Sequence, residues 1–510
     1  MIVQYVLLSL AVHRREILIV LGILFVYVLL ASALAGTRLP FSDDGDFAEP
    51  AARLIAGKSF AMPMEREWLP GLTRHVYCNM PLYFLAVAVW FKLFGVHFAT
   101  MGSLSVFWGL LTLLAWYVII RILWNEALVA LLGLALLALN YDFINLTSAR
   151  YDGMANGLST LGLAAYVLWR ERSLPLALVI SNAFLAAACM THPYAIFGMV
   201  GLLIFTLTMD RERLRWVHIF FASVPYLFAL GLWGWYISRD FNDFYAQISS
   251  SAHGRKVRSF NPVWIVYDEV SRRYLQSFGG LRSGVPVYMR LKSAVLIAYL
   301  AGFIGCLLSR RVMGNRGARA IVFSTGIFFL LLALLDGNRW YTYLIYLIPL
   351  YAIVLAFYLR VLLDRGAWVR RAVCAVVVGL TLFSIAGVVY RVRQDPYDRI
   401  YEPTARFLRD HVKGDDMVLS SGEFGFALGF GDHVIEDRSF GYRTGSLPAY
   451  IVLGQYYRSL IEISKTNDPA VFDYFTNTLR QRYSLVFQTD GGESAYQVYA
   501  RNASEPASSH

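Results

Sequence analysis

A cluster of acidic side chains stands directly after the first long apolar run of the chain. Asp43, Asp44 and Asp46 occupy three of four consecutive positions. Clustered carboxylates raise one another's pKa unless a cation lies among them, and such a carboxylate can act as a general base. The same residues suit a structural role, because Asp43 or Asp44 would cap a helix over 46–56 and place acids in its first turn. Capping and catalysis are compatible, so both interpretations stay open.

Two further segments place charged or titratable residues at the ends of apolar runs. Arg150 and Asp152 stand two positions apart at the start of one run, and His192 precedes Pro193 at the end of another. Unpaired charge is costly beside an apolar span, so Arg150 and Asp152 are each expected to have a partner. The structural alternatives are a local ion pair for these two residues and a helix-end histidine for His192.

Cationic side chains gather in two polar loops. Arg74 and His75 lie in the first loop, and Arg255, Lys256 and Arg258 lie in a later one. Such cations suit a phosphate or an anionic lipid headgroup. A solvated basic loop is the structural alternative for both groups.

The composition indicates a membrane protein. Of the 510 residues, 57% are hydrophobic and 16% are charged, against roughly 45–50% and about 25% in soluble proteins. Apolar runs of about 20 residues, the length that a bilayer demands, recur along the first three quarters of the chain. The net charge of +11 is concentrated in short loops between these runs, which favours a positive-inside topology over nucleic-acid binding.

The apolar runs predict about eleven transmembrane spans. These are 17–36, 103–122, 126–145, 153–169, 174–191, 193–208, 216–237, 291–308, 319–335, 341–359 and 369–390. Arginine is enriched in alternate loops, which predicts a plasma (inner) membrane protein with its N-terminus in the cytoplasm and 37–102, 145–152, 238–288 and 395–510 outside. The apolar segment 81–94 cannot cross without reversing this bias, so we expect a short helix at the outer surface.

The composition divides the chain into a transmembrane module over 1–394 and a small extracytoplasmic α/β domain over 395–510. The second part carries one helical segment and several strand-like runs. The helical segment is 401–412, and the strand-like runs are 417–420, 433–436, 485–488 and 496–500. A glycine-rich run at 422–429 lies outside the membrane, where nucleotide is scarce, so we do not interpret it as a phosphate loop.

An acid cluster, an Arg/Asp pair and several cations on one face suit a reaction in which a phosphate leaves. A carboxylate would deprotonate an acceptor hydroxyl, and cations would stabilise the departing phosphate. The sequence contains no Ser-His-Asp, GxSxG, Walker or HExxH pattern. Its four cysteines form no Cys-x-x-Cys pair, so no residue is assigned as a metal ligand.

With these motifs in this order, the sequence resembles the GT-C superfamily of polytopic glycosyltransferases, which use polyprenyl-phosphate sugars at the outer or luminal face. It is most similar to the branch of the protein O-mannosyltransferases and the lipid A aminoarabinose transferase. The segments that carry the resemblance are Asp43-Asp44-Gly45, Ala52-Arg53, Gly57, Met80-Pro81-Leu82-Tyr83, Phe91-Lys-Leu-Phe-Gly95 and Ala149-Arg150-Tyr-Asp152. Cys78-Asn79 stands where relatives often carry a basic residue or His with an extra proline, so the resemblance does not name the cation that meets the phosphate.

The resemblance implies an inverting transfer of sugar from a polyprenyl-phosphate donor to an acceptor hydroxyl. It places the general base on Asp43 or Asp44 and a second acid on Asp152, with Arg150 as its basic partner. From the charges of the outer loops together with this resemblance, we take as candidate substrate-binding residues Asp46, Arg74, His75, Arg150, His192, Arg255, Lys256 and Arg258. No cofactor is assigned, and a divalent cation stays open because some relatives bind one and others need none. The implied partners are the lipid-linked donor, a glycan, lipid or protein acceptor, and membrane lipids, without nucleic acid.

Two other classes of function stay as alternatives. A transporter or flippase of a polyprenyl-linked or anionic solute would carry ionisable residues within its spans and commonly a duplicated half. In this sequence the interior of most spans is free of ionisable residues, the charges gather at one face, and we see no duplicated half. A polysaccharide ligase or polymerase would carry a large outer loop rich in Arg and His instead of an early acid motif.

Overall fold

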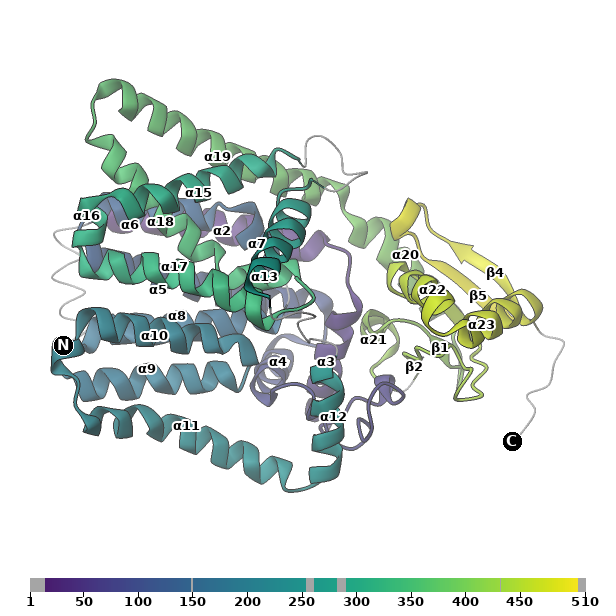
Figure 1. Ribbon diagram of the computed structural model, residues 1–510. Helices are drawn as coiled ribbons and strands as arrows, with labels where there is room; N and C mark the ends of the chain where they lie inside the picture. Colours follow the sequence, from purple (N-terminus) through teal and green to yellow (C-terminus); the bar gives the residue numbers. More distant parts are fainter. Residues whose placement is uncertain (1–13, 148–149, 254–260, 282–289, 432, 503–510) are drawn as a thin grey trace. The chain divides into compact units, whose positions relative to one another are not determined.

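The computed structural model describes residues 14–147, 150–253, 261–281, 290–431 and 433–502. The chain forms two compact units that are interleaved in sequence (Figure 1). The first, which we call the helical unit, contains the described parts of Met1–Leu34, Ser105–Arg239 and Ser251–Tyr390. The second, which we call the outer unit, contains those of Ala35–Leu104, Asp240–Ser250 and Arg391–His510.

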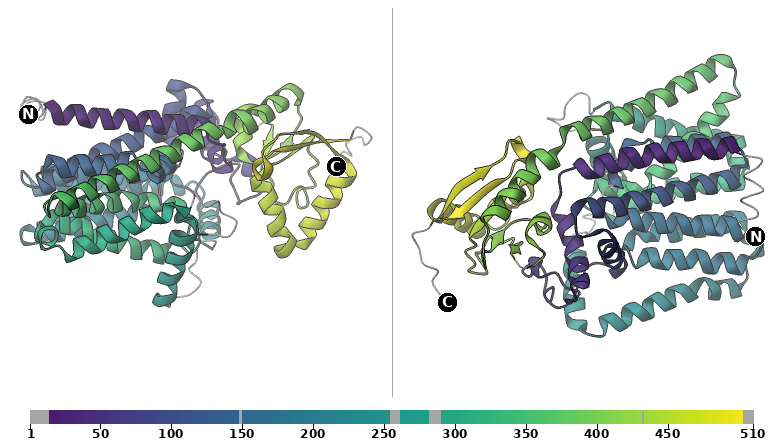
Figure 2. Two further views of the ribbon diagram at one scale, coloured as in Figure 1. Left: turned by 90° about the horizontal axis from the view of Figure 1, so that it is seen from above. Right: turned by 180° about the vertical axis from the view of Figure 1, so that it is seen from behind.

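The helical unit is a bundle of apolar helices, several of which lie side by side in all the views (Figures 1 and 2). Close pairs include α8 with α9, α9 with α11, α10 with α17, and α18 with both α6 and α15. Its helices are α2 (Arg14–Thr37), α5 (Phe98–Trp124), α6 (Ala127–Ala138), α7 (Tyr141–Leu146), α8 (Tyr151–Trp169), α9 (Leu174–Cys189), α10 (Ile196–Met209), α11 (Trp216–Ile237), α13 (Pro262–Asp268), η4 (Glu269–Phe278), α15 (Lys292–Leu308), α16 (Arg310–Gly314), α17 (Arg316–Leu335), α18 (Ile348–Leu363) and α19 (Ala367–Gln394). The first residues of α5 and the last residues of α2 and α19 belong to the outer unit.

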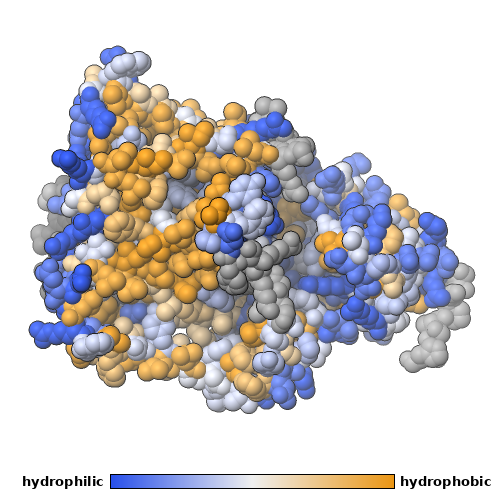
Figure 3. Space-filling view, viewed as in Figure 1, coloured by the Kyte–Doolittle hydropathy of each residue, from blue (hydrophilic) through white to orange (hydrophobic). Residues whose placement is uncertain are grey.

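Helix length and hydropathy mark the chain as an integral membrane protein. Five described helical stretches are long and apolar enough to cross a membrane: α2, α5, α11, α17 and the stretch that begins with α19. Each of the other predicted spans contains a helix, and most of these helices are shorter apolar ones. On α11, Leu227, Phe228 and Leu230 are 63–69% exposed, a pattern that suits lipid better than water. Figure 3 shows hydrophobic side chains spread over the surface of the bundle.

Two of the predicted spans are interrupted. The span expected over 126–145 is two helices, because α6 ends at Ala138 and Asn140 caps α7, where its side chain accepts a hydrogen bond from the Phe143 backbone N–H at 2.9 Å. The span expected over 341–359 begins with the 3₁₀ turn η5 (Tyr341–Tyr346), and the α-helix α18 begins at Ile348, one residue before Pro349. Proline is favoured at this first turn because its missing N–H would lack a partner there in any case.

The outer unit contains a five-stranded mixed sheet with the strand order β2-β1-β3-β5-β4. The first three of these are parallel, β5 is antiparallel to both β3 and β4, and Ile451 pairs with Leu419 and Tyr499. The strands are β1 (Val418–Leu419), β2 (Val434–Ile435), β3 (Tyr450–Leu453), β4 (Tyr483–Gln488) and β5 (Gln497–Arg501). The helices are α3 (Ser42–Ile55), α4 (Pro81–Phe94), α12 (Phe241–His253), η6 (Tyr397–Tyr401), α20 (Glu402–His411), α21 (Gly425–Leu428), α22 (Gln455–Asn467) and α23 (Pro469–Arg482), with 3₁₀ turns η1 (Pro63–Glu65) and η7 (Gly422–Phe424).

All four strand-like runs of the C-terminal region contain a strand, and the predicted helix is α20. The strand β3 was not expected, although it lies between β1 and β5. Its residues Ile451 and Leu453 pack with Tyr457 of α22 and Phe475 of α23 in the core of this domain. The apolar faces of two helices therefore cover a sheet whose central strand is short and buried.

Segment 81–94 forms the expected short helix, α4. Pro81 stands at its first turn, and Gly95 ends it with a φ of 86°. Tyr83 and Phe84 are buried, and both rings lie against Phe47 of α3, with centroids 5.9 and 6.4 Å away. This aromatic contact fixes α3, the helix that carries the acid motif, on α4. The position of α4 at the membrane surface remains a prediction.

Candidate functional site

The acid motif occupies the first turn of α3, where one of its members is fully engaged. Asp44 is 3% exposed, and Arg38 donates to both of its carboxylate oxygens, at 2.8 and 2.7 Å. The backbone N–H of Phe41 adds a third hydrogen bond at 2.8 Å. The Arg38 guanidinium also lies 4.6 Å from the Phe98 ring centroid. Asp44 therefore anchors the start of the helix.

The expected cap is wrong in position. The sequence suggested that Asp43 or Asp44 precedes a helix over 46–56, but α3 begins at Ser42 with Phe41 as its N-cap. The reason is that Asp44, three residues into the turn, reaches back to the Phe41 N–H and satisfies one of the donors that a helix start leaves without a partner. Asp43 lies in the same turn and is half-buried.

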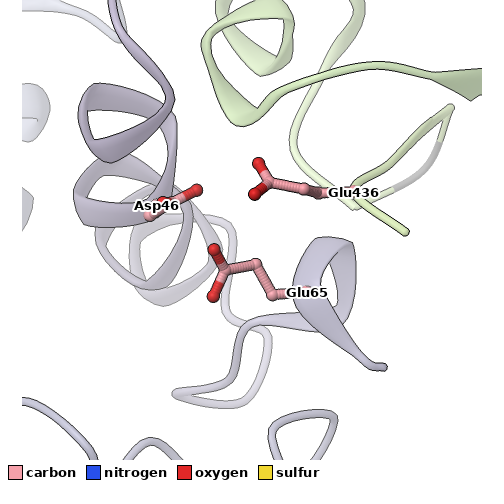
Figure 4. A group of neighbouring side chains, drawn as sticks. All are labelled: Asp46, Glu65 and Glu436. Carbon is pink, nitrogen blue, oxygen red and sulfur yellow. The ribbon is translucent and has the colours of Figure 1, made fainter. Parts of the chain in front are cut away.

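The third aspartate meets two glutamates that lie far from it in the sequence. Asp46 of α3, Glu65 of η1 and Glu436, which follows β2, point toward one another (Figure 4). One oxygen from each carboxylate lies within 4.8 Å of the other two. Ser42 Oγ and the Gly422 N–H both donate to Glu436 Oε2 at 2.9 Å. We call Asp46, Glu65 and Glu436 the carboxylate group.

Two glycines allow α3 to approach the C-terminal domain closely. A Cβ added at Gly45 would lie 1.9 Å from the Gly422 carbonyl oxygen, and one added at Gly422 would lie 2.5 Å from Asp46 Oδ1. Side chains at either position would force the backbones apart. The glycine-rich run at 422–429 therefore has a packing role at its first residue.

The surroundings of the carboxylate group disfavour its ionised form. Burial, and then the charges of Glu65 and Glu436, raise the pKa of Asp46 well above its usual value. Burial, and then the Glu436 charge, also raise the pKa of Glu65 to about 8. Arg438 is a nearby cation, with a guanidinium nitrogen 4.0 Å from Glu436 Oε1 and its guanidinium carbon 4.5 Å from the Trp68 ring centroid. Because Arg438 supplies one positive charge near three buried carboxylates, these carboxylates should favour binding a proton or a metal cation.

A second site lies in the helical unit, where three of the predicted residues meet. Arg150 Nε donates to Asp152 Oδ2 at 3.0 Å, and His192 Nδ1 lies 3.7 Å from Asp152 Oδ1. The Tyr194 N–H donates to that same Nδ1 at 3.2 Å. The His192 ring is stacked on Tyr151 with centroids 4.5 Å apart. Asp152 therefore pairs with Arg150, as the sequence predicted, and His192 contributes a buried aromatic face.

The remaining predicted cations are placed less favourably for a phosphate. Arg74 forms ion pairs with Asp240 at 3.4 Å and Asp243 at 2.8 Å, so two carboxylates already balance its charge. The His75 carbonyl accepts a hydrogen bond from the Gln247 side chain at 3.1 Å. Positions 255, 256 and 258 lie outside the described residues.

Sequence reasoning missed the two glutamates of the carboxylate group and their neighbour Arg438. Glu65 stands among other charged residues in a polar loop, and Glu436 ends a short strand in a different part of the chain. No local spacing connects these positions to Asp46. The only available signal was helical spacing: Asp46 lies one turn beyond Ser42, so both residues share one face of the helix, and that face was expected to pack against another part of the protein.

Solved structures with the same fold cover nearly the whole chain. The structure of ArnT from Cupriavidus metallidurans bound to undecaprenyl phosphate matches at a TM-score of 0.61 and 15% identity, over 97% of this chain and 99% of that one. Its apo form matches at a TM-score of 0.64 and 16% identity, with the same coverage. The chain has the GT-C fold.

More distant structures share the GT-C fold. The oligosaccharyltransferase AglB from Archaeoglobus fulgidus, in complex with an inhibitory peptide and a dolichol-phosphate, matches at a TM-score of 0.52 and 12% identity, over 96% of this chain and 75% of that one. An oligosaccharyltransferase structure from the same organism, in complex with Zn and sulfate, matches at a TM-score of 0.57 and 11% identity, over 94% and 73%. Comparisons with protein-family models and with curated protein sequences give no match.

Proposed function

We propose that this chain is a membrane glycosyltransferase that moves a sugar from a polyprenyl-phosphate donor to an acceptor hydroxyl at the outer face of the membrane. The observation that carries the proposal is the GT-C fold over 97% of the chain, shared with a protein solved with undecaprenyl phosphate. A polytopic apolar bundle gives a lipid-linked donor access from the bilayer. The acid motif offers a carboxylate that can act as the general base of such a reaction.

The general base in this proposal is Asp43. Asp44 already accepts two hydrogen bonds from Arg38 and one from the Phe41 backbone, and a carboxylate held in this way is a weak base because all of these contacts favour its ionised form. Asp43 is half-buried in the same first helical turn. The structure of α3 thus supports one of the two candidates that the sequence left open.

The reaction is a single displacement. Asp43 takes the proton of the acceptor hydroxyl, the oxygen attacks the anomeric carbon, and the bond from that carbon to the phosphate oxygen breaks. The electron pair leaves with the polyprenyl phosphate, and the single attack inverts the configuration at the anomeric carbon. Arg150, held by Asp152, is the cation that we assign to the donor phosphate, where a guanidinium can stabilise the charge that develops.

Sugar transfer from radiolabelled polyprenyl-phosphate donors in membranes tests the proposal. We expect Asp43→Asn to lower the transfer rate about 10²–10⁴-fold, the contribution typical of a general base. Asp44→Asn should chiefly lower thermal stability. Asp473→Asn, on the exposed face of α23, is the matched control and should leave transfer unchanged.

Three outcomes would contradict parts of this proposal. Full transfer by Asp43→Asn at an equal protein level would exclude it as the base. Transfer of a whole glycan from a lipid diphosphate carrier would indicate the ligase or polymerase. No labelled product with several donors, together with movement of the donor between leaflets, would indicate the transporter.

A further inference from the structure

The carboxylate group has the chemistry of a cation site. Its three members come from α3, η1 and the segment after β2, and one oxygen of each lies within 4.8 Å of the other two. All three side chains point into the same space (Figure 4). Each residue belongs to the outer unit.

Glu65 provides a second observation that points to a ligand. Its side chain is 1% exposed, and among the described residues no N–H or hydroxyl group donates to its carboxylate oxygens, which meet only the facing carboxyl of Asp46. Glu436 is also 1% exposed, but it has donors: Ser42 and the Gly422 N–H bond its Oε2, and the Tyr456 hydroxyl also donates to its carboxylate. Buried carboxylate oxygens normally accept hydrogen bonds or coordinate a cation, because desolvation of an ionised group is otherwise costly.

The local charge leaves room for a divalent ion. The three carboxylates carry three negative charges when ionised, and Arg438 supplies one positive charge near Glu436. A divalent cation would offset the excess negative charge of these groups. The alternative is protonation, since Asp46 and Glu65 face each other and could share a proton.

We propose that Asp46, Glu65 and Glu436 bind a hard divalent cation of the Mg²⁺, Mn²⁺ or Ca²⁺ type. Carboxylate oxygens are the ligands that these ions prefer, whereas structural zinc sites take histidine and cysteine. The remaining coordination positions would be filled by water or backbone oxygens, which is usual for these metals.

The role that follows from the geometry is positional. The cation would join the loop that carries α3 and η1 to the C-terminal sheet at the end of β2, beside the close contact of Gly45 with Gly422. It would thereby hold the helix turn that carries Asp43. This site is separate from the displacement reaction, so cation binding is tested without reference to transfer.

Direct binding of Mn²⁺ to the purified full-length chain in detergent tests the site. After treatment with a chelator and its removal, the loss of the free Mn²⁺ signal in electron paramagnetic resonance gives the stoichiometry and Kd. We expect about one saturable ion per chain, competition by Mg²⁺ or Ca²⁺, and a higher melting temperature with the cation. Glu65→Gln and Glu436→Gln should each weaken Mn²⁺ binding at least tenfold.

Glu423→Gln is the matched control. Glu423 is a buried glutamate of the same unit whose carboxylate does not belong to the carboxylate group; Ser421 and Tyr496 donate to its Oε1 at 2.7 and 2.9 Å, so this variant should keep wild-type Mn²⁺ affinity. No saturable binding to the wild-type chain would overturn the proposal even if a variant failed to fold. The proposal would also be overturned if folded Glu65→Gln and Glu436→Gln bound Mn²⁺ as tightly as the wild-type chain does. The carboxylate group would instead be a set of carboxyls that share protons if Glu65→Gln melts at a higher temperature than the wild-type chain and added cations do not change that temperature.

Discussion

Arg38 and Asp44 form a bidentate ion pair at the start of α3. Removal of this ion pair should strongly destabilise the outer unit. The side chains are 16% and 4% exposed, so Arg38→Ala would leave a buried carboxylate without its counter-charge. Such a loss costs about 3–5 kcal/mol. The Phe41 N–H remains bonded to Asp44 in this variant, so we expect the lower end, about 3 kcal/mol. In a unit of this size that is a fall in melting temperature of about 6–12 °C.

A double-mutant cycle separates the ion pair from the other contacts of each residue. Arg38→Ala also removes the contact with the Phe98 ring, and Asp44→Ala also removes the hydrogen bond to the Phe41 N–H, but neither loss enters the coupling between the two positions. We expect a coupling of about 2 kcal/mol, measured by thermal unfolding of the purified protein in detergent. Arg38→Lys should recover only part of the loss, because an ammonium cannot form both hydrogen bonds of the guanidinium fork.

A surface pair of the same unit provides the control. Arg406 lies 3.8 Å from Glu402, and its side chain is 70% exposed, so Arg406→Ala should cost less than about 1 kcal/mol. If Arg38→Ala costs no more than Arg406→Ala, or if the effects of Arg38→Ala and Asp44→Ala simply add, the anchoring role of Asp44 is refuted. The choice of Asp43 as general base would then lose its structural support.

Three further predictions concern other parts of the molecule. Burial raises the pKa of Glu423 to about 7, so its folded form holds a proton more tightly than the unfolded chain and stability is lost as the pH rises from about 4.3 to 7; Glu423→Gln should reduce the fall in melting temperature over that window, and an unchanged pH profile would contradict the assignment. Gly45→Ala places a Cβ 1.9 Å from the Gly422 carbonyl and should cost about 1–3 kcal/mol in thermal unfolding, whereas wild-type stability would mean that α3 packs differently. Asp152→Asn weakens the hold on Arg150 and should lower kcat/KM for the lipid-linked donor about tenfold; an unchanged kcat/KM in the transfer assay would separate this pair from the donor.

Local patterns determined much of this protein from its sequence. Apolar runs of bilayer length place helices at every predicted span, because a helix in lipid must satisfy all of its backbone hydrogen bonds internally. Alternation and turn residues located four of the five strands. The pair of Arg150 and Asp152 was also predictable, since two charges only two positions apart beside an apolar span have few other partners.

Only the tertiary structure decided how the acids of the first outer loop differ from one another. In sequence, Asp43 and Asp44 are equivalent neighbours, but in the structure the Arg38 guanidinium donates to both carboxylate oxygens of Asp44. Asp46 meets Glu65 and Glu436 only because α3 packs closely on the C-terminal domain. Helix and strand periodicity reports which face of an element is buried, and it carries no information about which distant carboxylate will lie opposite. The proposals for the general base and for the cation site therefore rest on contacts that form only when the chain is folded.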